Sequence, residues 1–146
     1  MSVVHESSAS CADVWSVLSD GWFFASWVVG ASRIRAVEPD WPAVGSRIHH
    51  SVGVWPALID DTTEVLESVP ERELKLLARV FPVGQAAITL RLHPAGSGCR
   101  IEIIELAASA PLNLAPEWLQ EIVIRPRNVE ALRRLALIAE HSSRPR

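Results

Sequence analysis

Two adjacent histidines, His49 and His50, are the first residues in this sequence whose types suggest chemistry. Successive residues of a strand point to opposite faces of a sheet, so the pair cannot bind one ion from regular strand geometry. Alternation places His50 on the face of Ile48 and Val52, and His49 on the face of Arg47. We therefore expect no metal site. His50 is predicted to be either a core histidine hydrogen-bonded to a neighbour or a ligand-contacting, acid/base group.

A carboxylate, Glu105, is the second candidate. It alternates with Ile101 and Ile103 on one face of a predicted strand, whereas Arg100 falls on the other face. A carboxylate on an apolar face needs a partner such as an arginine or His50. A pair of Glu105 with His50 is the sharpest acid/base hypothesis that the sequence offers.

The other polar residues give weaker indications of a catalytic site. Asp60 and Asp61 point to opposite faces of a strand, so they do not form a paired-carboxylate device, and we expect them at a strand start facing solvent. The sequence has no nucleophile elbow, no phosphate-binding glycine loop and no zinc-ligand spacing. These absences argue against hydrolase or nucleotide chemistry, and no cofactor is expected.

The aromatic composition is unusual, because the chain has six tryptophans and no tyrosine. Tyrosine normally supplies the hydroxyl that orients a substrate, so a cavity in this protein is predicted to be apolar. Several tryptophans could line such a cavity or fill the core: Trp15, Trp27, Trp41, Trp55 and Trp118.

The composition predicts one globular domain over residues 1–146, in which 49% of residues are hydrophobic and 21% are charged. This is more apolar than a compact domain needs, so the surplus is expected in a ligand cavity, in a partner interface such as that of a homodimer, or in a well-filled core. The net charge is −3 and the basic residues are scattered, which argues against nucleic acid as a partner.

Compartment and membrane association are predicted from the cysteines and the longest apolar run. Cys11 and Cys99 lack metal-ligand spacing, and the start of the chain does not resemble a signal peptide, so the cytoplasm is expected. The apolar run at 22–31 is too short to span a bilayer, which needs about 18 to 20 residues, and no membrane insertion is expected.

Periodicity predicts mostly strands between two helical regions. A first strand precedes Ser10, a short helix covers about 11–19, and the aromatic segment after it is a second short helix or an irregular turn. Strands follow without intervening helices, which favours an antiparallel meander. Their predicted ranges are 32–37, 46–54, 59–69, 73–80, 86–93 and 99–107.

A long helix is predicted after Pro116, with a frayed tail at 141–146. Pro126 lies inside it, so a kink or two stacked helices are expected there. One apolar stripe is predicted to pack this helix on the sheet: Leu119, Ile122, Val129, Leu132, Ala136 and Ala139.

The order of these elements is that of the α+β helix-grip fold, in which a curved antiparallel sheet of about seven strands wraps round a C-terminal helix. Four segments, "ADVWSVLSDGWFFASWVVGA", "WPAVGSRIHHSVGVWP", "TTEVLESVPERELKLLAR" and "RNVEALRRLALIAE", resemble the START-like polyketide cyclase/dehydrase and lipid-transport superfamily (SRPBCC), in the form common among small actinobacterial proteins. The resemblance covers about residues 3–141. It implies a cavity between the sheet and the long helix.

The resemblance further implies binding of a small hydrophobic ligand, such as a lipid, a polyketide or an aromatic metabolite. The expected ligand-contacting residues are Phe24, Trp27, His50, Val52, Trp55, Glu105 and Trp118. An aromatase/cyclase or dehydratase in which His50 and Glu105 act as acid and base is the alternative, because a cyclase can work largely by holding a flexible chain in a reactive shape. A structural module without a usable cavity is the third interpretation.

Overall fold

A seven-stranded antiparallel sheet dominates the computed structural model, which describes residues 1–52, 59–80 and 84–142. The strands are β1 (Ser2–Ser7), β2 (Ala31–Val37), β3 (Arg47–Val52), β4 (Ile59–Val69), β5 (Glu73–Val80), β6 (Gly84–Ala95) and β7 (Gly98–Ala107). Their order in the sheet is β1-β7-β6-β5-β4-β3-β2. The predicted meander is confirmed for β2 to β7, and β1 extends the sheet beyond β7.

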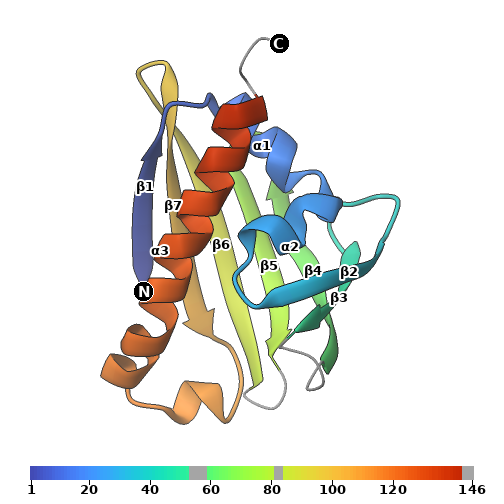
Figure 1. Ribbon diagram of the computed structural model, residues 1–146. Helices are drawn as coiled ribbons and strands as arrows, with labels where there is room; N and C mark the ends of the chain where they lie inside the picture. The colour runs from blue at the N-terminus through green and yellow to red at the C-terminus, as the bar shows by residue number, and fades with distance from the viewer. Residues whose placement is uncertain (53–58, 81–83, 143–146) are drawn as a thin grey trace.

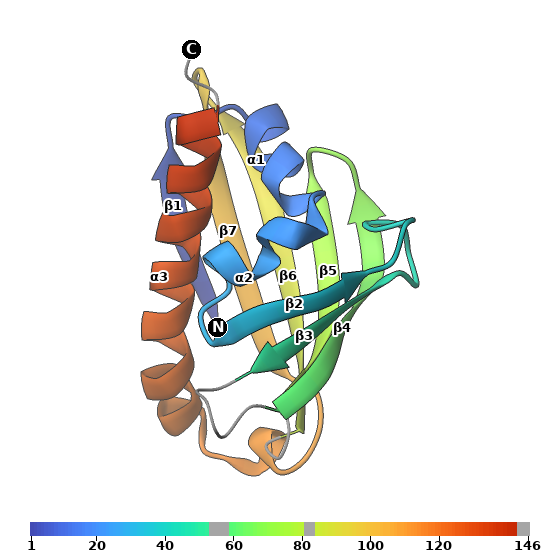
Figure 2. The same cartoon turned by 45° about the vertical axis from the view of Figure 1, so that its right-hand side comes forward.

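All the helices are packed on or beside one face of this sheet. They are α1 (Cys11–Leu18), the one-turn 3-10 helix η1 (Gly21–Phe23), α2 (Phe24–Trp27), the 3-10 helix η2 (Leu112–Leu114) and α3 (Glu117–Ser142). The sheet curves round α3, which runs along its concave side (Figure 1). Turning the molecule shows α1 and α2 between α3 and the β2–β3 end of the sheet (Figure 2). This is the α+β helix-grip fold that the element order predicted.

Local sequence explains where the first elements begin and end. The Ser10 hydroxyl accepts a hydrogen bond from the backbone N–H of Asp13 at 3.1 Å, so it caps the start of α1. The Asp20 carboxylate accepts from the N–H of Trp22 and caps the 3-10 turn that follows. The aromatic segment thus forms two short helical elements, which bury Phe24 and Trp27 on the concave side of the sheet.

The long helix differs from its prediction in which face it buries. Leu132, Ala136 and Ala139 are buried as expected, but Leu119, Ile122 and Val129 are exposed. The residues that α3 buries in its first half are instead Ile124 and Asn128, followed by Ala131, Leu132, Leu135, Ala136 and Ala139. The predicted stripe was wrong in this half because the helix carries apolar residues on two faces.

Pro126 lies inside α3, which continues through it as one helix. The alternative of two stacked helices is therefore not what the chain adopts. His141 and Ser142, predicted as part of a frayed tail, belong to the last turn of α3, and the rest of that tail is outside the described residues.

Side chains from the concave face of the sheet and from α1, α2 and α3 form a continuous core. Cys11 at the start of α1 and Cys99 on β7 are joined by a disulfide, which was not predicted because 88 positions separate the two residues. The cysteines therefore give no argument for a reducing compartment. No helix among the described residues has both the length and the apolar character needed to cross a membrane.

Candidate ligand-binding site

A cavity of about 80 Å³ lies between the concave face of the sheet and the helices. Space of this size is large enough to hold several water molecules. Its apolar lining comes from α2 and the residues after it, from β5, β6 and β7, and from α3: Phe24, Trp27, Val28, Val29, Leu76, Ala78, Ile88, Ile103 and Ala131. Its polar lining is formed by His50, Thr63, Arg79, Glu105, Arg127 and Asn128.

His50 lines this cavity from β3, the side to which strand alternation assigned it. It is only 4% exposed. Its Nε2 lies 2.9 Å from the hydroxyl oxygen of Thr63 on β4, and its ring is 5.4 Å from the ring of Phe24, measured between centroids. Its neighbour His49 points to the other face of the strand and pairs with Glu38 at 3.3 Å.

The second ring nitrogen of His50, Nδ1, has no hydrogen-bond partner among the described residues, although it is buried. Buried polar atoms normally have a partner, so an unpaired nitrogen beside a cavity calls for a ligand or water. Burial lowers the pKa of His50 below 6.5, and Arg35 and His49 lower it further, while Asp61 opposes them. The imidazole is therefore neutral near pH 7.

Glu105 lines the same cavity from β7, and α3 supplies its partners. The Arg127 guanidinium donates a hydrogen bond to Oε1 and forms an ion pair with it. The Asn128 amide donates to Oε2 at 2.8 Å. The expectation that Glu105 is buried and needs a partner such as an arginine is confirmed.

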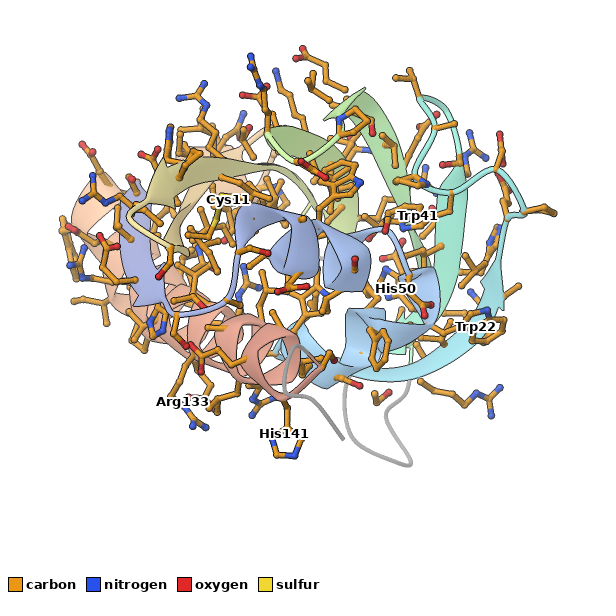
Figure 3. All side chains as sticks on the ribbon, turned by 90° about the horizontal axis from the view of Figure 1, so that it is seen from above. Cys11, Trp22, Trp41, His50, Arg133 and His141 are labelled. Atoms are coloured by element: carbon orange, nitrogen blue, oxygen red, sulfur yellow. A yellow bond between two sulfur atoms is a disulfide. The ribbon has the colours of Figure 1, made fainter. Side chains whose placement is uncertain are left out.

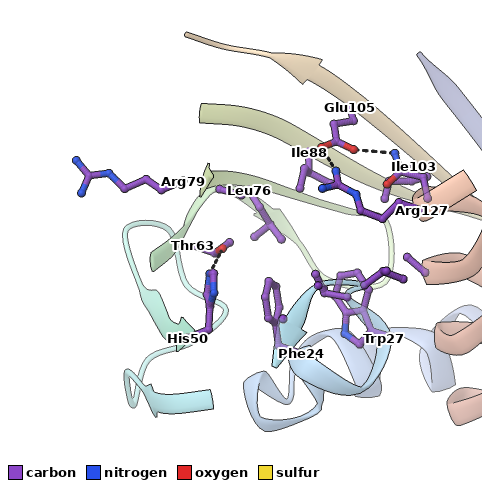
Figure 4. A pocket seen from close by; sticks show the side chains of 17 residues that line it. Phe24, Trp27, His50, Thr63, Leu76, Arg79, Ile88, Ile103, Glu105 and Arg127 are labelled. Atoms are coloured by element: carbon purple, nitrogen blue, oxygen red, sulfur yellow. Dashed lines mark hydrogen bonds and ion pairs between the residues drawn. The ribbon is translucent and has the colours of Figure 1, made fainter. Parts of the chain in front are cut away.

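The predicted pair of Glu105 with His50 is wrong. The two side chains bond to different partners, and Figure 4 shows Thr63 beside His50 at one end of the lining and Arg127 beside Glu105 at the other. Phe24 and other apolar side chains lie between them. The cavity thus has two separated polar ends.

The tryptophans are distributed differently from the prediction. Trp27 lines the cavity, as does Phe24, and their rings meet edge to face with centroids 5.5 Å apart. Trp41 is in the core, where its indole N–H donates to the carbonyl of Leu18, and Trp15 packs partly buried against that core.

Trp118 was expected to contact ligand, but the structure places it away from this cavity. Its side chain is 63% exposed and is not among the described residues that line the cavity. It lies in the first turn of α3, on the face that points away from the sheet. Of the two remaining candidates, Val52 ends β3 but its side chain lies outside what the structure describes, and Trp55 lies wholly outside the described residues.

Four polar lining residues were missed: Thr63, Arg79, Arg127 and Asn128. Thr63 alternates with the buried Val65 on β4, and the same alternation puts Asp61 on the inner face, so the expectation that Asp61 faces solvent was wrong. The Asp61 carboxylate accepts a hydrogen bond from the backbone N–H of Thr62 at 2.8 Å. The alternation of inward and outward side chains along β4 was the sequence signal that could have identified Thr63 as a lining residue.

Among the described residues, no group of three or more histidine, cysteine or acidic side chains could hold a metal ion.

Comparison with known proteins now adds the class to which the fold and cavity belong. The family model described as "Polyketide cyclase / dehydrase and lipid transport" matches residues 1–140, so the chain belongs to that family. A search of the curated proteins finds no match.

Three solved structures illustrate how widely this fold is shared. Protein NE0264 from Nitrosomonas europaea is 14% identical with a TM-score of 0.74, over 98% of this chain and 95% of that one. The di-domain ARO/CYC StfQ from the steffimycin biosynthetic pathway is 11% identical with a TM-score of 0.75, over 98% of this chain and 51% of that one. Ara h 8.0201 is 10% identical with a TM-score of 0.69, over 95% of each chain. At these identities the likeness concerns the fold alone.

Proposed function

We propose that this protein binds a small, largely apolar molecule that carries one hydrogen-bonding group, and that this group pairs with Nδ1 of His50. The observation that carries the proposal is the unpartnered buried nitrogen in the lining of a mostly apolar cavity. Affinity comes from burial of apolar surface against Phe24, Trp27 and the strand side chains, at about 25 cal/mol per Å². The nitrogen then selects among apolar molecules of similar size.

The ligand class follows from the size of the cavity and from the free nitrogen. A cavity of about 80 Å³ admits one ring or a short acyl segment of a lipid, polyketide or aromatic metabolite, and the rest of a larger ligand lies outside it. If Nε2 of His50 donates to the Thr63 hydroxyl, Nδ1 accepts from a ligand hydroxyl. If Thr63 donates instead, Nδ1 carries the proton and donates to a ligand carbonyl.

A matched ligand pair tests this proposal. Tryptophan fluorescence, to which Trp27 in the lining contributes, is titrated with 2-naphthol and with naphthalene. The wild type is expected to prefer 2-naphthol, because burying Nδ1 without a partner costs about 1–3 kcal/mol. His50→Phe keeps an aromatic ring and removes the nitrogen, and it should reduce that preference roughly tenfold.

His49→Gln is the control, since this neighbour points to the other face and should leave the preference unchanged. A flat fluorescence response across fatty acids, naphthols and polycyclic aromatics would refute the binding proposal and favour a module without a usable cavity. An equal preference in wild type and His50→Phe would refute the role of His50.

A second candidate function is acid/base catalysis in the same cavity, as an aromatase/cyclase or dehydratase. It is favoured by the lowered pKa of His50, which leaves a neutral imidazole with one nitrogen free to accept a proton. Glu105 is a weaker candidate for proton transfer, because both of its oxygens already accept hydrogen bonds. Turnover of a polyketide mimic that is lost in His50→Phe while binding persists would distinguish this enzyme from a binder.

A further inference from the structure

The outer face of α3 is apolar over its first three turns, where a surface helix is normally polar. Trp118, Ile122 and Val123 are 63%, 64% and 65% exposed. Leu119 and Val129 are also exposed and lie on the same side at helical spacing. We call these five residues the outer stripe. Apolar side chains in one exposed strip on a small domain indicate an interaction surface.

The outer stripe is confined to the first half of the helix. Further along, the exposed positions are mostly polar or charged, with Leu137 as an apolar exception, and Figure 3 shows Arg133 and His141 projecting away from the body of the molecule. Arg133 and Arg134 both pair with Glu130, which closes the stripe with a charged cluster. The inward face of the same helix turns holds Ile124 and Asn128 in the core. The stripe is therefore separate from the cavity lining.

The charges beside the outer stripe indicate what covers it. Glu121 and Arg125 lie four residues apart along one flank, both about half exposed, with the acid nearer the start of the helix. Two copies of the helix related by a two-fold axis perpendicular to its length run antiparallel and bring this same flank of each together in reversed order. Each Glu121 then faces the other copy's Arg125. In a parallel pair, whose two-fold axis runs along the helices, this flank would face the partner's opposite flank, and these charged groups would not meet.

We propose that the outer stripe is a homodimer interface, in which α3 of one copy packs antiparallel on α3 of a second copy across a two-fold axis near Val123. With the axis there, Trp118 of each copy packs beside Val129 of the other, and the Ile122 and Val123 side chains meet at the centre. The flank of the stripe carries Glu121 paired with Arg125, so it has no net positive charge of the kind that would attract an anionic lipid surface. The proposal is independent of the ligand and of His50.

Sedimentation equilibrium of the whole chain, at about 1 to about 200 µM, tests the interface. The wild type is expected to dimerise. Ile122→Glu should raise the dimer dissociation constant roughly 100-fold, because the interface would then bury one added negative charge from each copy near the two-fold axis. Leu137→Glu is the control, since Leu137 is exposed on the same helix about 22 Å further along. It should leave the dissociation constant unchanged.

Charge exchange tests the antiparallel arrangement. Glu121→Arg and Arg125→Glu should each weaken the dimer about tenfold, and the double exchange should restore it, because the complementary pairs re-form across the axis. Circular dichroism checks that every variant keeps its helix. A monomeric wild type, an Ile122→Glu variant that still dimerises, or a double exchange that is not restored would overturn the proposal. So would a monomer that sediments with vesicles of phosphatidylcholine and phosphatidylglycerol through Trp118.

Discussion

At the scale of single residues, the environment of His50 decides its charge. The side chain is buried beside Phe24, and within the part of the chain that the structure describes its ring hydrogen-bonds to the Thr63 hydroxyl, a neutral group. Nothing at that ring compensates fully for the loss of water around a positive charge, so burial keeps the pKa low. A ligand that pairs with Nδ1 thus meets an uncharged imidazole.

The stability of the protein should therefore fall as the pH is lowered through this histidine. Below about pH 6.5 the unfolded chain takes up a proton at His50 that the folded protein does not, so the free energy of unfolding decreases. Urea unfolding followed by circular dichroism from about pH 7.5 to about pH 5 measures the effect. His50→Phe should lose less stability over this range than the wild type, because it has no imidazole to protonate at this position. Parallel curves for wild type and His50→Phe would contradict the assignment.

At the scale of elements, the β6–β7 hairpin fixes where β1 joins the sheet. Gly98 opens β7 at a point where a Cβ atom would lie 2.2 Å from the Ser7 carbonyl oxygen on β1. The backbones of the two strands approach closely there, because Ser7 pairs with Cys99. Gly96, two residues earlier in the turn, has a φ of +61° and open space around it.

Replacing each glycine by alanine should separate the steric clash expected at Gly98 from the backbone strain expected at Gly96. Gly98→Ala is expected to cost about 2–4 kcal/mol, because backbone atoms must move apart. Gly96→Ala should cost only about 1 kcal/mol, because the alanine must adopt the left-handed backbone conformation of Gly96 but its Cβ meets no other atom. Equilibrium unfolding in urea measures both. Equal losses in the two variants would show that the approach of β1 to β7 is less tight than the structure has it.

At the scale of the whole molecule, the cavity exists only because sheet and helix are brought together without filling the space between them. Ala131 on α3 and Ala78 on β5 are small lining residues on opposite sides. Five residues further along the helix, Ala136 is buried in the hydrophobic core. The same helix therefore borders both empty and filled space.

Leucine at these two alanines should have opposite consequences. Ala131→Leu places its side chain in the cavity, so binding of 2-naphthol should fall at least about tenfold with little loss of stability. Ala136→Leu overpacks the core and should cost about 1–3 kcal/mol while the folded protein still binds. Fluorescence titration and thermal unfolding measure both variants. Unchanged binding in Ala131→Leu would place the ligand elsewhere.

Much of the fold could be predicted from local patterns. The ranges 59–69 and 73–80 match β4 and β5, because alternation and bounding turn residues are properties of neighbouring positions. The same alternation placed His50 and Glu105 on inner faces. The phase of α3 could not be predicted, because with apolar residues on two sides the sequence does not say which side meets the sheet.

The sequence by itself determined the order of the elements, the meander and the apolar interior that accepts a histidine and a carboxylate, since each depends on residue type and short-range period. Only the tertiary structure decided the partners: Thr63 for His50, Arg127 and Asn128 for Glu105, and Cys11 for Cys99. These contacts join distant segments whose register and helix rotation are set by packing of the whole core. For the same reason, only the fold separates the inward face of α3, which borders the cavity, from the outer stripe.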